Sequence, residues 1–131
     1  MLRSFSMIHI LPMELVNALE KDLIKLLVLD RADLSSDSKH LISMAHIKQR
    51  VIYIIKDDLI MSDLTPAELS SILWHEYWHI HSRTSDEEAC DKYAIMHTSQ
   101  EIYLSAISKT KKLMKIFGKE VFSDKYKHRE R

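Results

Sequence analysis

Residues 65–94 read TPAELSSILWHEYWHIHSRTSDEEACDKYA, and this stretch decides the fold that we expect. Thr65 is a favourable N-cap residue, and Pro66 suits the first helical position. Glu68 stands three residues after Thr65, which completes the pattern of a capping box. Many apolar residues and no further Gly or Pro follow, so we predict a helix over residues 66–82.

Two more helix starts follow the same pattern of a hydroxyl residue with Glu three positions later. They predict Ser85 with Glu88 as the start of a helix over 86–97, and Thr98 with Glu101 as the start of a helix over 99–117. Gly118 is a plausible end for the last helix, because Gly accepts the left-handed conformation of a C-cap. The second half of the chain is therefore predicted to be helical.

The first half of the chain is predicted to mix one helix with strands. Residues 13–29 place leucines at helical spacing with charges between them, which indicates an amphipathic helix. A polar loop follows, and then two β-like runs at 41–47 and 51–55 form a hairpin or two adjacent strands. We predict a helix-rich α+β, zincin-like single domain over residues 1–118, with a small antiparallel or mixed sheet packed on the 66–82 helix. Residues 119–131 form a basic tail.

Composition, charge and cysteine content limit the classes of function that we expect for this protein. The chain has 131 residues, is 46% hydrophobic and 29% charged, and has a net charge of zero, so no nucleic-acid partner is expected. No apolar run approaches the roughly 20 residues needed to span a bilayer, so no membrane span is expected. Cys90 is the single cysteine, which excludes an internal disulfide and suits a reducing compartment. We expect a cytoplasmic protein whose oligomeric state the sequence does not indicate.

His75, Glu76 and His79 form the motif H-E-x-x-H inside the predicted 66–82 helix. Positions four apart lie on one helix face one turn apart, so both imidazoles can reach one metal ion at about 2 Å. Glu76 is rotated from that face but can still reach a water on the ion. The alternative is a pair of histidines that are hydrogen-bonded in a helix interface.

A catalytic zinc site needs a third protein ligand and an open position for water. The available candidates after the motif are His81, Asp86, Glu87, Glu88, Asp91 and His97. Glu87 and Asp91 are four apart and share a helix face, so one can bind the metal while the other accepts a hydrogen bond from a ligating histidine. The alternative is that these acids favour the N-terminus of their helix electrostatically.

The sequence HEYWH followed by EEACDKYA resembles the gluzincin metallopeptidases, and in its length the short minigluzincins. The resemblance covers roughly residues 41–97. It implies that His75, His79 and Glu87 bind Zn²⁺, that Glu76 is the general base, and that Asp91 orients a histidine. Two positions depart from the family pattern: Trp78 precedes the second histidine where the family has Gly, and Cys90 stands where it has a smaller residue.

We therefore predict a zinc-dependent peptidase that acts on a protein or peptide substrate, with Glu76 taking the proton of the attacking water. The donor for the oxyanion is left open among Tyr77, Tyr93, His97, Tyr103 and His128. The side chains Trp74, Trp78 and Tyr53 could line a cleft or belong to the core. Two alternatives stay open: a non-catalytic zinc-stabilised module of a larger assembly, and a helical interaction protein without a metal.

Overall fold

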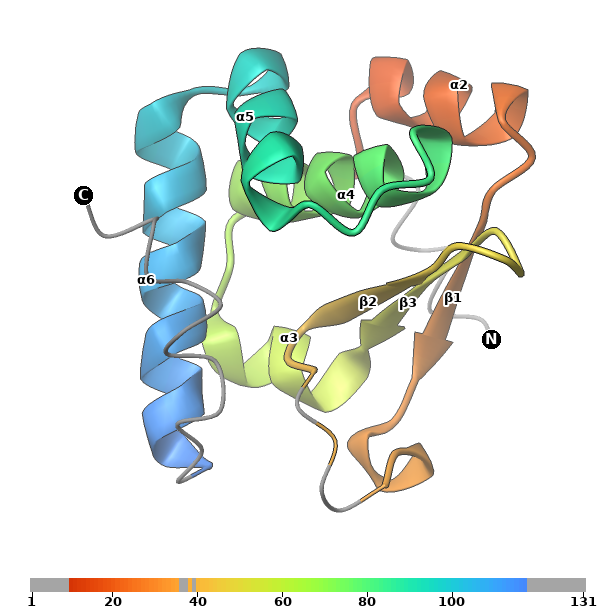
Figure 1. The fold of residues 1–131 in the computed structure, drawn as a ribbon. Coiled ribbons are helices and arrows are strands. Elements are labelled where there is room, and N and C mark those ends of the chain that lie inside the picture. Colours follow the sequence, from red (N-terminus) through yellow and green to blue (C-terminus); the bar gives the residue numbers. More distant parts are fainter. Residues whose placement is uncertain (1–9, 36–37, 39, 118–131) are drawn as a thin grey trace.

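The computed structural model describes residues 10–35, 38 and 40–117. Five α-helices and a three-stranded sheet make up this part of the chain (Figure 1). In chain order the elements are α2 (Met13–Lys21), β1 (Lys25–Leu29), the 3-10 helix η1 (Arg31–Asp33), β2 (Ser43–His46), β3 (Val51–Ile55), α3 (Lys56–Ser62), α4 (Pro66–His81), α5 (Glu87–His97) and α6 (Gln100–Ile116). The predicted helix-rich α+β class is confirmed. The basic tail and the Gly118 cap lie outside the described residues.

The sheet has the strand order β1-β3-β2, which makes β2 an edge strand in the described part of the chain. The strands β1 and β3 are parallel, with Lys25 opposite Val51, whereas β2 and β3 are antiparallel, with Ser43 opposite Ile54. The predicted pair of adjacent strands is therefore confirmed, and the sheet is mixed because β1 adds to it in parallel.

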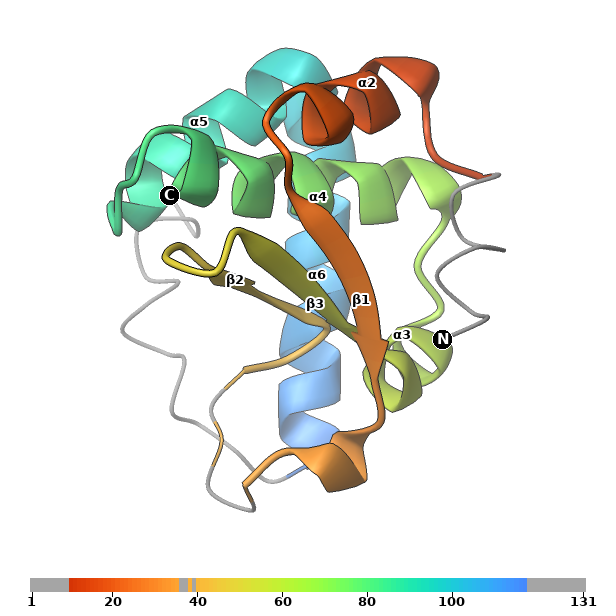
Figure 2. The same ribbon diagram turned by 90° about the vertical axis from the view of Figure 1, so that its right-hand side faces the viewer.

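Helix α4 lies at the centre of the molecule. Figure 2 shows it running between the sheet on one side and α2 and α5 on the other. Its apolar side chains Leu69, Leu73 and Ile80 are at most 2% exposed and belong to the hydrophobic core. A helix that is buried around most of its circumference holds its side chains in fixed rotamers, which is what a functional site needs.

The helix predicted over residues 13–29 is wrong beyond Lys21. Asp22 ends α2, Leu23 takes a left-handed conformation with φ 56°, and the chain continues as β1. Leu23 is one of the leucines whose helical spacing indicated a buried helix face, but it is 80% exposed. The run KLLVL pairs along its whole length with the apolar strand β3, and this pairing overrides the local helical spacing.

One of the three predicted capping boxes is confirmed. The Thr65 hydroxyl accepts from the Glu68 amide at 3.1 Å, and Glu68 accepts from the Thr65 amide at 2.8 Å. The other two are wrong by one residue. Asp86 caps α5 in place of Ser85, and Ser99 caps α6 in place of Thr98. An Asp or Ser adjacent to the expected cap is an equally good acceptor for the free amides, so local sequence does not separate the two registers.

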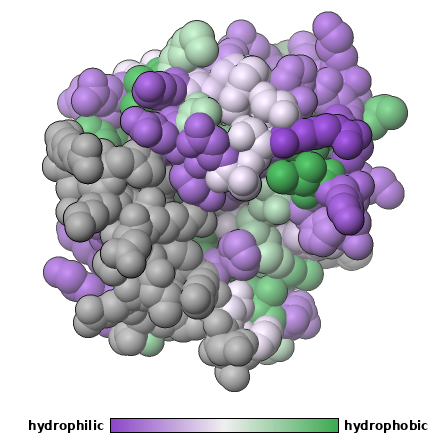
Figure 3. Space-filling view, in the orientation of Figure 1, coloured by the Kyte–Doolittle hydropathy of each residue, from purple (hydrophilic) through white to green (hydrophobic). Residues whose placement is uncertain are grey.

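Exposed apolar side chains occur on several elements of the described part of the chain. Its most exposed large apolar side chains, Met13, Leu23, Ile60 and Met96, belong to different segments of the chain. Figure 3 shows hydrophilic and apolar residues interspersed on the face that it displays. Scattered apolar residues of this kind are normal on protein surfaces. No helix among the described residues is long and apolar enough to cross a membrane.

Candidate metal centre

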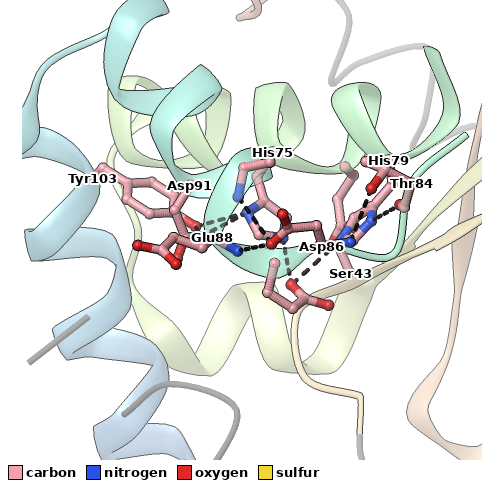
Figure 4. A network of polar contacts seen from close by, with 11 residues as sticks. Ser43, His75, His79, Thr84, Asp86, Glu88, Asp91 and Tyr103 are labelled. Atoms are coloured by element: carbon pink, nitrogen blue, oxygen red, sulfur yellow. Dashed lines mark hydrogen bonds and ion pairs between the residues drawn. The ribbon is translucent and has the colours of Figure 1, made fainter. Parts of the chain in front are cut away.

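His75 and His79 lie one turn apart on the face of α4 that α5 covers. Both residues are buried, with exposed fractions of 6% and 8%, and their ring centroids are 4.9 Å apart. Figure 4 shows the two side chains extending from the same helix face. The spacing expected from the sequence therefore produces two converging imidazoles in a largely dry environment.

Glu87 is the first residue of α5 and lies between the two imidazoles. Its Oε1 atom is 2.9 Å from His75 Nε2 and 3.4 Å from His79 Nε2. In a tetrahedral zinc site with bonds of about 2.0–2.1 Å, neighbouring ligand atoms are roughly 3.3 Å apart. Glu87 Oε1 is thus at about this separation from each imidazole nitrogen, and nitrogen and oxygen donors suit that ion.

The outer nitrogen of each imidazole has its own partner. His79 donates from Nδ1 to the Thr84 carbonyl at 2.7 Å, so its Nε2 is directed at the centre. His75 Nδ1 lies 2.9 Å from Asp91 Oδ1 and 2.9 Å from the Tyr103 hydroxyl, which itself donates to Asp91. Such partners fix the tautomer and the orientation of metal-binding histidines. Asp91 has the contact that was expected of it, whereas the contribution of Tyr103 from α6 was not anticipated.

Glu76 lies on the side of the centre that faces a pocket. It is half-buried, and its Oε2 accepts a hydrogen bond of 2.6 Å from the Ser43 hydroxyl on β2. Ser43 is separated from the motif by more than thirty residues, and nothing in the local sequence marks it as a partner. The hydrogen bond holds one oxygen of the carboxylate in place.

The pocket has a volume of about 200 Å³. His75, Glu76, His79 and Glu87 line one part of it, and the edge strand β2 lines another. Apolar side chains of α4 and α6, among them Ile72 and Ile107, complete the wall. Apolar walls with a few convergent polar groups are typical of a ligand site.

The charges around His79 favour a cation at this position. Burial alone would lower the pKa of His79, but the Cys90 thiol, the Glu87 and Glu76 carboxylates and the Thr84 carbonyl together raise this pKa to about 11. A divalent ion would meet the same favourable field. The donor atoms, their spacing and the local charge therefore all fit a bound metal.

Cys90 is a third metal-binding type of side chain close to the histidines. Its sulfur and one ring nitrogen each of His75 and His79 all lie within 4.8 Å of one another. The side chain is completely buried, and burial raises the pKa of the thiol. The sequence predicts no role for Cys90 beyond its bearing on disulfides and its place in the family pattern.

The remaining acids and histidines after the motif are exposed or have other partners. Asp86 caps α5 through the amides of Glu88 and Ala89, and Glu88 itself is exposed. His81 pairs with Asp22 at 2.6 Å, and His97 stacks on Trp74 with ring centroids 4.0 Å apart.

Most of the candidate oxyanion donors also lie elsewhere. Tyr77 donates to Asp22 at 2.6 Å, Tyr93 stacks on Trp78, and neither residue lines the pocket. Tyr103 does line the pocket, but its hydroxyl is hydrogen-bonded to Asp91. His128 lies outside the described residues. The aromatic residues Trp74, Trp78 and Tyr53 are not part of the pocket wall.

Comparisons with protein-family models, curated proteins and solved structures give no match for this chain.

Proposed function

We propose that this protein is a zinc-dependent peptidase of the minigluzincin type. The observation that carries the proposal is the position of Glu87 Oε1 between the Nε2 atoms of His75 and His79, with Glu76 beside them on the pocket side. His75, His79 and Glu87 would hold the ion, and three protein ligands are the number that catalytic zinc sites use.

Glu76 is the general base in this proposal. When bound, zinc supplies Lewis-acid chemistry at the reacting carbonyl. Glu76 accepts the proton of the attacking water and later delivers it to the leaving amine. The Ser43 hydroxyl binds Oε2 of Glu76, so it would hold the carboxylate in one orientation and leave Oε1 to take the proton.

The edge strand β2 supports a peptide as the substrate. In the described part of the chain, β2 pairs only with β3, and Ser43, Met44 and Ala45 line the pocket. An extended peptide can bind the edge of a sheet through main-chain hydrogen bonds and place its side chains in adjacent pockets. A peptide aligned with β2 would carry its backbone past Glu76.

Glu76→Gln should abolish peptide hydrolysis and leave the zinc content unchanged. The amide has nearly the same shape but cannot accept the proton, and loss of a general base typically costs about 10²–10⁴-fold in rate. Zinc content would be measured by elemental analysis and cleavage with a broad peptide library. Glu88→Gln is the matched control, because Glu88 is exposed and lies on the neighbouring helix.

Two results would contradict the proposal. Cleavage by Glu76→Gln at the wild-type rate would exclude Glu76 as the base, and a wild type that contains no zinc would exclude the metal centre. A wild type that contains zinc but cleaves no peptide of the library would favour the non-catalytic zinc-stabilised module instead.

A further inference from the structure

Cys90 belongs to the same helix face as Glu87. It lies three residues after Glu87 in α5, so both side chains are directed at α4. The Cys90 thiol is within hydrogen-bonding reach of His79, and Asp91, the next residue, contacts His75. Helix α5 therefore presents three side chains in succession to the two histidines of α4.

The distances distinguish Cys90 from an ordinary buried cysteine. A free cysteine usually packs as a small apolar side chain and needs no polar partner. Here the sulfur and a ring nitrogen of each histidine lie within 4.8 Å of one another. In a tetrahedral site with Zn–N of about 2.0–2.1 Å and Zn–S of about 2.3 Å, these separations would be roughly 3.3–3.6 Å. Because no separation exceeds 4.8 Å, movements of at most about 1.5 Å would bring the thiol into the coordination sphere.

A ligand from Cys90 would approach the metal from the interior of the protein and would not enter the pocket. Glu76 and Glu87 line the pocket, whereas Cys90 does not and is completely buried. A sulfur ligand from Cys90 would thus reach the metal from the interior of the protein. With four protein ligands, a water on the pocket side would be a fifth ligand, and zinc in catalytic sites can become five-coordinate.

We propose that Cys90 is a metal ligand at this centre, acting as a thiolate together with His75, His79 and Glu87. The inference rests on the proposed metal centre and adds a ligand that the zinc peptidase pattern does not contain. Binding exchanges the thiol proton for the metal, so one proton is released to solvent for each ion bound by Cys90. A thiolate also favours zinc over oxygen-preferring ions such as Mg²⁺ or Ca²⁺.

Substitution of cobalt(II) tests this ligand directly. Cobalt-loaded wild type should show a thiolate-to-cobalt charge-transfer absorption in the near ultraviolet, together with the visible bands of the bound ion. Cys90 is the only cysteine of the chain, so within the chain this absorption has one source. Cys90→Ser should lose the near-ultraviolet absorption and keep visible bands. Met96→Leu, which removes an exposed thioether, is the control and should match wild type.

The outcomes separate this inference from the proposed function. Visible cobalt bands without the near-ultraviolet absorption in wild type would overturn the role of Cys90 and leave the metal centre standing. An absence of any cobalt bands would overturn the metal centre itself, and with it this inference. The wild-type spectrum decides between them even where Cys90→Ser fails to fold.

Discussion

At the scale of single residues, His75 uses both of its ring nitrogens. Its Nε2 is directed at Glu87, and its Nδ1 contacts Asp91 and Tyr103. The ring of Tyr103 also stacks on His75, with the two planes at 18° and the centroids 6.1 Å apart. These contacts orient the imidazole, so for the proposed metal the ligand is already ordered by folding.

Asp91→Asn should weaken zinc binding about 10- to 100-fold, because loss of such a partner changes the basicity and orientation of the histidine. Tyr103→Phe should weaken it less, since the ring packing remains and only the hydroxyl is lost. Dissociation constants would be measured by competition with a chromophoric chelator. Tyr53→Phe is the control, because Tyr53 does not line the pocket. Wild-type affinity in Asp91→Asn would exclude the orienting role.

The residues of the site differ in how far sequence could predict them. The spacing of His75, Glu76 and His79 is a local pattern, and it was sufficient to predict that the three residues lie close together on one helix. Glu87 and Asp91 followed from the same spacing on the next helix together with the family resemblance. Ser43 and Tyr103 reach the site from β2 and α6, and only the tertiary fold brings those elements to α4. No local signal marks such residues.

At the scale of elements, the N-terminus of α4 is joined to α6 by one buried carboxylate. Glu68 closes the capping box with Thr65, and it also accepts hydrogen bonds from Lys109 at 2.7 Å and from Ser105. Burial alone would raise the pKa of Glu68, but the bonds from Lys109, Ser105 and Thr65 lower it to about 2. The contact fixes the direction in which α4 begins and hence where its histidines lie.

The Glu68 contacts predict an acid-sensitive contribution to stability. The pKa of Glu68 falls from 4.5 to about 2 on folding, so the unfolded chain binds more protons between these values. The stabilisation is fully present above pH 4.5 and is lost as the pH falls toward 2. Glu68→Gln should lower the free energy of unfolding at pH 7 by up to about 3 kcal/mol.

The measurement is urea unfolding of wild type and Glu68→Gln at several pH values. The difference between the two proteins should shrink as the pH falls below 4.5, and acid release of a metal, which is common to both, cancels in that difference. Glu101→Gln, an exposed acid in the first turn of α6, is the control. A difference that stays constant from pH 7 to pH 3 would contradict the assignment.

The helix boundaries show how far local sequence can predict the helices and strands. The helices α4, α5 and α6 were predicted to within about a residue at the described ends, because caps and apolar runs are local features. The error at residues 22–29 has a different origin. Those residues have the spacing of a helix, but β3 offers them a parallel partner, and a parallel partner is distant in the sequence. Strand pairing of this kind depends on the whole fold.

At the scale of the whole molecule, the proposed metal would link the two helices that carry the site. Helix α4 already packs in the core, whereas the face of α5 toward it carries Glu87, Cys90 and Asp91. The carboxylates beside the two buried histidines need a positive charge close by, which a protonated imidazole or a metal ion can supply. Metal binding and stability should therefore be coupled.

Removal of zinc by a chelator should lower the melting temperature of wild type, because a ligand that binds only the folded state adds about 4 kcal/mol when its concentration is 1,000 times its dissociation constant. Hydrogen exchange should locate the loss in α5 and residues 82–86, while β1 and β3, whose pairing does not involve the site, keep their protection. The double variant His75→Ala, His79→Ala should melt at one temperature with and without zinc. A chelator that strips stoichiometric zinc from wild type without changing its melting temperature would show that the ion, although bound, contributes no measurable stability to the fold.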